Sequence, residues 1–75
     1  MDGERFGRRV RAFRKLKRIP QAELARRLNL STSFLGRIER GEKTPDIEML
    51  EKIAEQLEIN IQELIGDFTE KEGHV

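Results

Sequence analysis

The sequence predicts a compact all-α domain built from five short helices, and three observations support this prediction. Apolar residues recur three and four positions apart along most of the chain, which is the spacing of one helix face. Tyr and Trp are absent and β-branched residues are few, so strands receive little support. A chain of 75 residues without cysteine has room for one domain, which must fold by packing alone.

The first two helices are predicted over about residues 4–17 and 21–28. Apolar residues in the first of them stand at positions i, i+4 and i+7. Pro20 precedes the second helix, where its fixed φ and its missing amide hydrogen suit a helix start. The residues expected to face the core from these two helices are Phe6, Val10, Phe13, Leu24, Ala25 and Leu28.

The third helix is predicted to begin after Ser31 and to end at Arg40 and Gly41. Asn29 lies in the preceding turn, and asparagine is, after glycine, the residue that most readily adopts the left-handed conformation that closes a helix. The Ser31 hydroxyl is suited to the N-cap, where it can accept a hydrogen bond from a backbone amide of the first turn.

The last two helices are predicted after position 45 and after position 60. The fourth opens at Asp46, or at Thr44 followed by Pro45. The fifth is short and begins with the spacing of a capping box at residues 60–63. The apolar stripe expected to bury the fourth helix comprises Ile47, Leu50, Ile53, Ala54 and Leu57.

The second and third helices are joined by about three residues, too few to close an antiparallel hairpin comfortably. They are therefore expected to cross steeply, which makes residues 21–40 a helix-turn-helix unit. We predict one domain over residues 1–66 and a flexible tail over residues 67–75.

Charge is divided unevenly along the chain. Residues 1–40 carry twelve Lys or Arg and four acids, a net charge of +8, whereas residues 41–75 carry three Lys and ten acids, a net charge of −7. This division suggests a basic face for a polyanion and an acidic face turned away from it. An ordinary solvated surface explains the charge numbers equally well.

The third helix presents short polar side chains and one long cation on its outer face, at Thr32, Ser33, Gly36 and Arg37. A slim helix of this kind fits the DNA major groove, which is about 12 Å wide. Arg37 can donate two hydrogen bonds to guanine, and a solvated arginine is the simpler alternative. Gly36 suggests a close approach of the backbone to another group, or is tolerated variation. Phe34 either packs against the domain or touches a thymine methyl.

Three segments resemble the Cro/cI-type (Xre) helix-turn-helix regulators, namely Gln21-Ala22-Glu23-Leu24-Ala25, Leu30-Ser31 and Ile38-Glu39-Arg40-Gly41. The likeness extends from about Phe6 to Ile65 and is nearest to the DNA-binding half of SinR-like regulators. It implies a lambda-repressor-like fold and a bacterial protein that binds double-stranded DNA in a sequence-specific way. The implied role is regulation of transcription by blocking or recruiting polymerase, with repression as the favoured alternative.

The resemblance also implies roles for individual residues. Gln21 matches the family glutamine that binds a phosphate and braces the reading helix, and Arg14 with Glu39 matches an interior ion pair. The groove-facing positions of the family correspond to Thr32, Ser33 and Arg37. The DNA-binding set also includes Ser31, Arg40, Lys43 and Thr44, of which the last three are either phosphate contacts or ordinary surface.

The sequence departs from the resemblance at three turns where the family usually has glycine, namely Arg18, Asn29 and Glu58. These residues are therefore expected in the left-handed conformation. At Arg18 and Glu58 this costs roughly 1–2 kcal/mol each. Pro20 also replaces the usual Ser or Thr cap.

Enzymatic function, cofactors and metal ions are not expected. The only histidine is the next-to-last residue, His74, and Ser31 and Ser33 have no evident base to activate them. Neither a glycine-rich phosphate loop nor a cluster of metal ligands is evident. No apolar run approaches the roughly 20 residues needed to cross a bilayer, so we expect a cytoplasmic protein without membrane contact.

The expected partner is an operator in double-stranded DNA, bound by a homodimer on an inverted repeat with half-sites about 10 base pairs apart, or a multiple of that. The apolar residues that could form the dimer contact, or merely close the core, are Ile59, Ile61, Ile65 and Phe68. Two alternatives remain open at this point. One is an antitoxin-like role in which the acidic second half binds a basic protein, and the other is a protein-interaction module that does not bind DNA.

Overall fold

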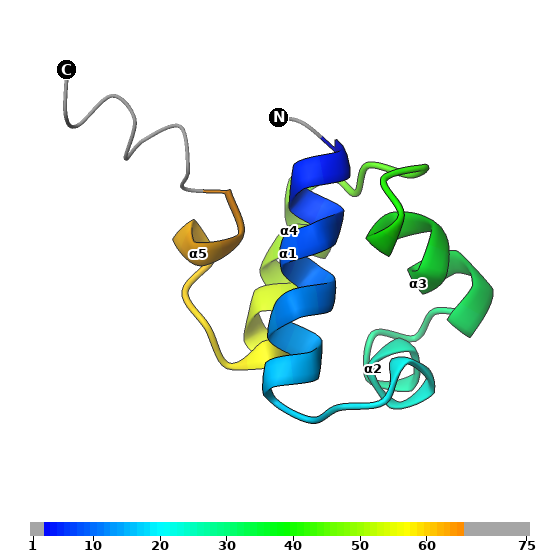
Figure 1. Ribbon diagram of the computed structural model, residues 1–75. Coiled ribbons are helices and arrows are strands. Elements are labelled where there is room, and N and C mark those ends of the chain that lie inside the picture. The colour runs from blue at the N-terminus through cyan, green and yellow to red at the C-terminus, as the bar shows by residue number, and fades with distance from the viewer. Residues whose placement is uncertain (1–2, 66–75) are drawn as a thin grey trace, which may run out of the picture.

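The computed structural model describes residues 3–65, and within them it contains five helices and no strand (Figure 1). The bounds are Gly3–Leu16 for α1, Gln21–Arg27 for α2, Thr32–Glu39 for α3, Ile47–Leu57 for α4 and Gln62–Ile65 for α5. Every predicted helix is present, so the all-α prediction is confirmed. The tail predicted over residues 67–75 lies outside the described residues, and so do Phe68 and His74.

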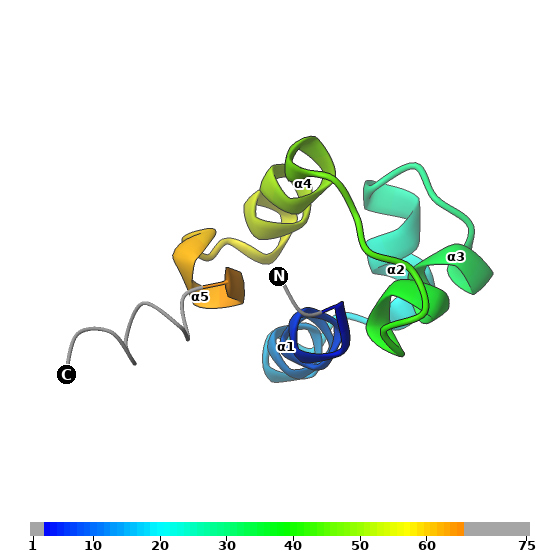
Figure 2. The same ribbon diagram turned by 90° about the horizontal axis from the view of Figure 1, so that it is seen from above.

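The helices surround a single core. In Figure 1, α1 runs through the middle of the molecule with α4 behind it. Figure 2 shows α2 and α3 together on one flank of this pair and α5 on the opposite flank. The helix-turn-helix pair is therefore exposed along one side, while α1 and α4 support it from behind.

Every helix contributes apolar side chains to the core. The buried residues are Phe6, Val10, Leu24, Ala25, Leu28, Leu35, Ile38, Leu50, Ile53, Ala54, Leu57 and Leu64. Phe13 is half-buried and packs against them. Because these residues follow the predicted helical stripes, most of the predicted core is confirmed.

Ile47 is the exception, and its prediction as a core residue is wrong. It is 58% exposed, although it shares a helical stripe with Leu50 and Ala54. Ile47 is the first residue of α4. Side chains tilt toward the N-terminus of their helix, so the side chain of the first residue projects past the end of the core.

Hydrogen bonds at the helix starts follow the sequence. The Ser31 hydroxyl accepts a bond of 3.0 Å from the Phe34 amide at the start of α3. Asp46 caps α4 by accepting a bond of 2.9 Å from the Met49 amide, which decides between the two predicted openings of that helix. Pro20 stands at the N-cap of α2 and provides no side-chain bond.

The three non-glycine residues predicted to be left-handed are confirmed, with φ of 62° at Arg18, 63° at Asn29 and 58° at Glu58. In each case the amide of the next residue reaches back five positions to a helix carbonyl. The three bonds run from Ile19 to Arg14 at 3.0 Å, from Leu30 to Ala25 at 2.8 Å, and from Ile59 to Ala54 at 3.0 Å. These bonds satisfy carbonyls at the helix ends and offset part of the backbone strain.

Gly7 brings the backbones of α1 and α3 into direct contact. A β-carbon at this position would overlap the carbonyl oxygen of Ile38 and lie 2.7 Å from that of Glu39. Gly7 could not be singled out from the sequence, since its importance depends on which helix crosses it. This contact sets how close the last turn of α3 lies to α1.

Candidate nucleic-acid interface

The buried faces of α2 and α3 pack into the core and hold the α2–turn–α3 unit in place. Leu24 and Ala25 of α2 are buried together with Leu35 and Ile38 of α3. Leu28 closes α2 and is 5% exposed, so the turn itself is also anchored. Little of this pair can shift without disturbing the core, and α3 is therefore a rigid platform for the residues on its outer face.

A buried ion pair ties α3 to α1. The Arg14 guanidinium donates to both carboxylate oxygens of Glu39, from Nε at 2.7 Å and from Nη2 at 3.1 Å. Arg14 Nη1 also donates to the Ile19 carbonyl at 3.0 Å. Arg14 is 8% exposed and Glu39 is 5% exposed, so the structure brings the two residues together in the interior, as the resemblance implied.

Gln21 joins this ion pair. Its side-chain nitrogen Nε2 donates to Glu39 Oε1 at 3.1 Å. Gln21 is the first residue of α2, so the bond links the start of α2 to the end of α3. Of the two tasks implied for Gln21, bracing the reading helix has a defined contact. Binding a phosphate remains a prediction.

The outer face of α3 is accessible. Thr32, Ser33 and Arg37 are all exposed, and the Arg37 side chain retains 49% of its accessible surface. Gly36, which was expected on this face, is buried instead. A β-carbon at Gly36 would lie 3.1 Å from Arg40 Nη1 and 3.6 Å from Gln21 Nε2. The missing side chain thus makes room for two polar side chains of the protein itself.

The C-terminal end of α3 carries a surface ion-pair cluster. Arg40 Nε donates to Glu42 Oε2 at 2.9 Å, and Arg37 Nε lies 3.9 Å from Glu42 Oε1. The hydrogen bond from Arg40 holds the pKa of the Glu42 carboxyl below its ordinary value. Glu42 was not predicted from the sequence, because only the fold of the loop turns its carboxylate back toward α3.

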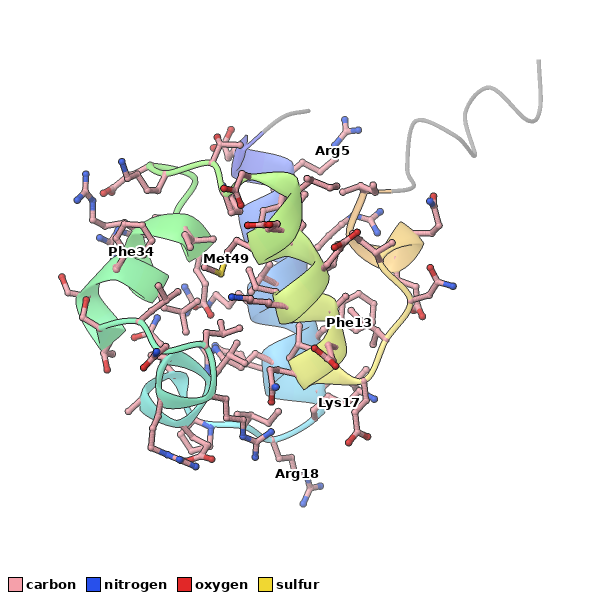
Figure 3. All side chains as sticks on the ribbon, turned by 180° about the vertical axis from the view of Figure 1, so that it is seen from behind. Arg5, Phe13, Lys17, Arg18, Phe34 and Met49 are labelled. Atoms are coloured by element: carbon pink, nitrogen blue, oxygen red, sulfur yellow. The ribbon has the colours of Figure 1, made fainter. Side chains whose placement is uncertain are left out.

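Beyond this cluster, Lys43 and Thr44 are exposed in the loop before α4. Lys43 Nζ lies 5.9 Å from the centroid of the Phe34 ring, within the range of a cation–π contact. Phe34 is half-buried and, with Met49, lines a hollow of about 280 Å³ between α3 and α4. Figure 3 labels both side chains. Phe34 therefore packs partly against the domain. Ser31, predicted in the DNA-binding set, uses its hydroxyl oxygen to cap α3.

A second cluster of charges lies on α2. Glu23 accepts hydrogen bonds from Arg26 Nη2 at 2.5 Å and from Arg27 Nε at 2.9 Å. These bonds lower the pKa of the Glu23 carboxyl to about 2. Their small surface stabilisation is therefore present above the ordinary pKa near 4.5 and is lost as the pH falls toward 2. The spacing of three and four residues is typical of such pairs.

Among residues 3–65, no group of three or more His, Cys, Asp or Glu side chains is placed to hold a metal ion. Over the same part of the chain, no helix has the length and apolar character to span a membrane.

Comparison with known proteins assigns the family. A family model described as Helix-turn-helix matches residues 10–64, which is most of the chain. The chain belongs to the helix-turn-helix family. The match includes α2, α3 and α4 together with the second half of α1, and the resemblance found in the sequence is thereby confirmed.

Relatives within the helix-turn-helix family cover nearly all of the described fold. An uncharacterized HTH-type transcriptional regulator of Bacillus subtilis, YazB, is 45% identical over 64 residues, 85% of this chain and 93% of that protein. The regulator SinR of the same species is 34% identical over 68 residues, which cover 89% of this chain and 61% of SinR.

A solved helix-turn-helix structure supports the same assignment. The restriction-modification controller protein C.AhdI from Aeromonas hydrophila superposes with a TM-score of 0.79 at 35% identity. The superposition covers 84% of this chain and 96% of the controller protein. The five-helix arrangement is therefore the fold of helix-turn-helix regulators, and membership of this family agrees with the prediction that the chain is not an enzyme.

Proposed function

We propose that the protein is a sequence-specific DNA-binding regulator of transcription that reads the major groove with α3. The observation that carries this proposal is the exposed polar face of Thr32, Ser33 and Arg37 on a helix whose position is fixed from behind. The Arg14–Glu39 ion pair and the Gly7 contact hold that helix against α1. A rigid reading helix loses little conformational entropy when it binds, so its contacts translate efficiently into affinity.

The proposed interface contains two kinds of contact, one to phosphates and one to bases. Gln21, Arg40, Lys43 and Thr44 would bind phosphates and set the register of the domain on the duplex. Basic side chains release counterions from DNA as they bind, which supplies affinity without sequence preference. Arg37 would then donate two hydrogen bonds to O6 and N7 of a guanine.

We further propose that a homodimer binds an inverted repeat, because one domain of this size covers few base pairs. The dimer would act as a repressor in the cytoplasm. Ile59, Ile61 and Ile65 are half-buried and pack against the core. Core closure therefore accounts for part of their surface, and only their remaining exposed edges are available for a dimer contact.

The test is selection of bound duplexes from a random pool, followed by the same selection with two variants. Arg37→Ala is expected to lose its preference at one base pair, worth about 1–3 kcal/mol of discrimination. Gln21→Ala is expected to weaken all duplexes to a similar extent and to keep the motif. Competitive binding to matched and mismatched duplexes measures both effects. An unchanged motif with Arg37→Ala would remove Arg37 from the assigned role, and an asymmetric motif would argue against the inverted repeat.

A second function, binding a basic protein partner, is favoured by a groove on α4. The groove has a volume of about 560 Å³, and its apolar lining of Ala54, Ile59 and Ile61 is bordered by acidic side chains. Its charged residues are Glu48, Glu51, Lys52 and Glu55. Such a lining suits a helix with one apolar face and flanking Lys or Arg residues.

This partner surface has a direct test. Glu51→Lys combined with Glu55→Lys is expected to abolish capture of a basic partner encoded beside this protein. Because the groove lies on α4, the same variant should still select the wild-type DNA motif. If the double variant captures the partner as well as the wild type does, the groove is not the binding surface.

A further inference from the structure

Glu42 lies between two arginines of the proposed DNA-contacting surface. Its carboxylate accepts two hydrogen bonds from Arg40, from Nε at 2.9 Å and from Nη2 at 3.4 Å. The same carboxylate lies 3.9 Å from Arg37 Nε. A phosphate would need the same guanidinium hydrogens, because a phosphate and a carboxylate each offer a pair of oxygens that can accept both bonds of the arginine fork.

The backbone places Glu42 in this position. Gly41 follows α3 with a φ of 81°, in the left-handed region that suits glycine. The Gly41 amide donates to the Ile38 carbonyl at 3.0 Å, and the Glu42 amide donates to the Arg37 carbonyl at 2.8 Å. This helix-ending pattern turns the chain back over the last turn of α3. Glu42 is therefore fixed beside Arg37 and Arg40 through its main chain as well as through its side chain.

Arg40 is also aligned with the proposed phosphate-binding residue Gln21. A single point, the β-carbon position of Gly36, lies 3.1 Å from Arg40 Nη1 and 3.6 Å from Gln21 Nε2. The ends of the two side chains thus lie over the same part of α3. An anion that reached both of them would have to compete with Glu42 for Arg40.

We propose that Glu42 competes with DNA phosphates for the two arginines at the end of α3. Its carboxylate occupies Arg40 and restrains Arg37 until a duplex displaces it. This inference rests on the proposed function. The displaced carboxylate gains cations from solution as the arginine gains a phosphate, so one fewer counterion is released overall. Glu42 therefore lowers the affinity for any duplex and weakens its dependence on salt.

The test measures binding to a random-sequence duplex by fluorescence anisotropy over a series of salt concentrations. Glu42→Gln keeps the shape of the side chain and removes its charge. It is expected to bind roughly tenfold more tightly at low salt, and its plot of log affinity against log salt should steepen by about one unit. The gain should shrink as salt is raised.

Glu58→Gln is the matched control, since it removes the same charge from an exposed position at the C-terminal end of α4. It is expected to leave the slope unchanged and to raise affinity by less than a factor of about three, through long-range screened attraction alone. If Glu42→Gln and Glu58→Gln give the same slope and the same affinity, the proposal is overturned. Thermal unfolding of both variants verifies that they are folded.

A second variant separates competition from a general effect of charge. Arg40→Gln should reduce affinity more in the Glu42→Gln background than in the wild type, because there Arg40 binds a phosphate without first having to displace Glu42. Equal reductions in both backgrounds would contradict the proposal. If the wild type and Glu42→Gln both fail to bind any duplex at low salt, the proposed function fails as well. If the wild type binds DNA but Glu42→Gln and its control variant behave alike, the proposed function stands and only the role of Glu42 as a competitor is overturned.

Discussion

Glu39→Ala is expected to destabilise the fold by about 3–5 kcal/mol, the usual cost of removing one partner from a buried ion pair. The Arg14 guanidinium would lose two of its three hydrogen bonds and keep only the one to the Ile19 carbonyl. Arg14 is 8% exposed, so water cannot readily replace the lost carboxylate. Domains of this size are stable by roughly 3–10 kcal/mol, so most of the stability would be lost.

Urea unfolding followed by far-ultraviolet circular dichroism measures this effect. Glu48→Ala on the exposed side of α4 is the control and should change stability by less than about 0.5 kcal/mol. The double variant Arg14→Met with Glu39→Leu should recover much of the loss, because an apolar pair of similar volume leaves no buried charge. A single variant as stable as the wild type would mean that Arg14 reaches water in solution.

The same substitution should affect DNA binding apart from its effect on stability. Gln21 also donates to Glu39, so the carboxylate connects α1, the start of α2 and the end of α3. Without this carboxylate, the side chain of Gln21, a proposed phosphate contact, loses its hydrogen bond to position 39. The stability of the domain and the position of its reading helix thus depend on one buried carboxylate.

Local features of the fold were predictable from the sequence because they depend on short-range chemistry. Ser31 and Asp46 cap helices through their own side chains, so their residue types identify the helix starts. Arg18 and Glu58 have no intrinsic preference for left-handed backbone. Their conformation followed from the family resemblance, which indicated glycine positions at those turns, and the structure confirms it.

Features that depend on how helices cross were not predictable in this way. Gly36 was placed on the outer face by its helical position, yet the side chains of Arg40 and Gln21 cover it. Ile47 fits the apolar stripe of α4 and lies beyond the end of the core. Glu42 reads in the sequence as one more surface acid, and only the turn at Gly41 brings it to the arginines. Each outcome depends on neighbours that are distant in sequence or on chain direction after a turn.

Gly7→Ala is the second substitution with a large expected effect, and it should destabilise the fold by about 1–3 kcal/mol. Alanine favours an isolated helix over glycine by about 1 kcal/mol, so local propensity predicts the opposite sign. The added β-carbon would overlap the Ile38 carbonyl and lie 2.7 Å from the Glu39 carbonyl. Both are backbone atoms held by the core, so α1 and α3 must separate to admit the methyl group.

Gly36→Ala provides the matched control within α3, since both substitutions add one methyl group to a buried helical glycine. At Gly36 the nearest atoms are the ends of two flexible side chains, which can move aside. Helix propensity should then dominate, and Gly36→Ala should be neutral or stabilise by up to about 1 kcal/mol. Urea unfolding of the two variants measures the contrast. If both variants changed stability in the same direction and by the same amount, the backbone contact between α1 and α3 would not explain the glycine at position 7. The opposite signs are expected because the atoms that a new methyl group would contact differ in mobility. The packed backbone carbonyls beside Gly7 can move far less than the solvent-exposed guanidinium beside Gly36.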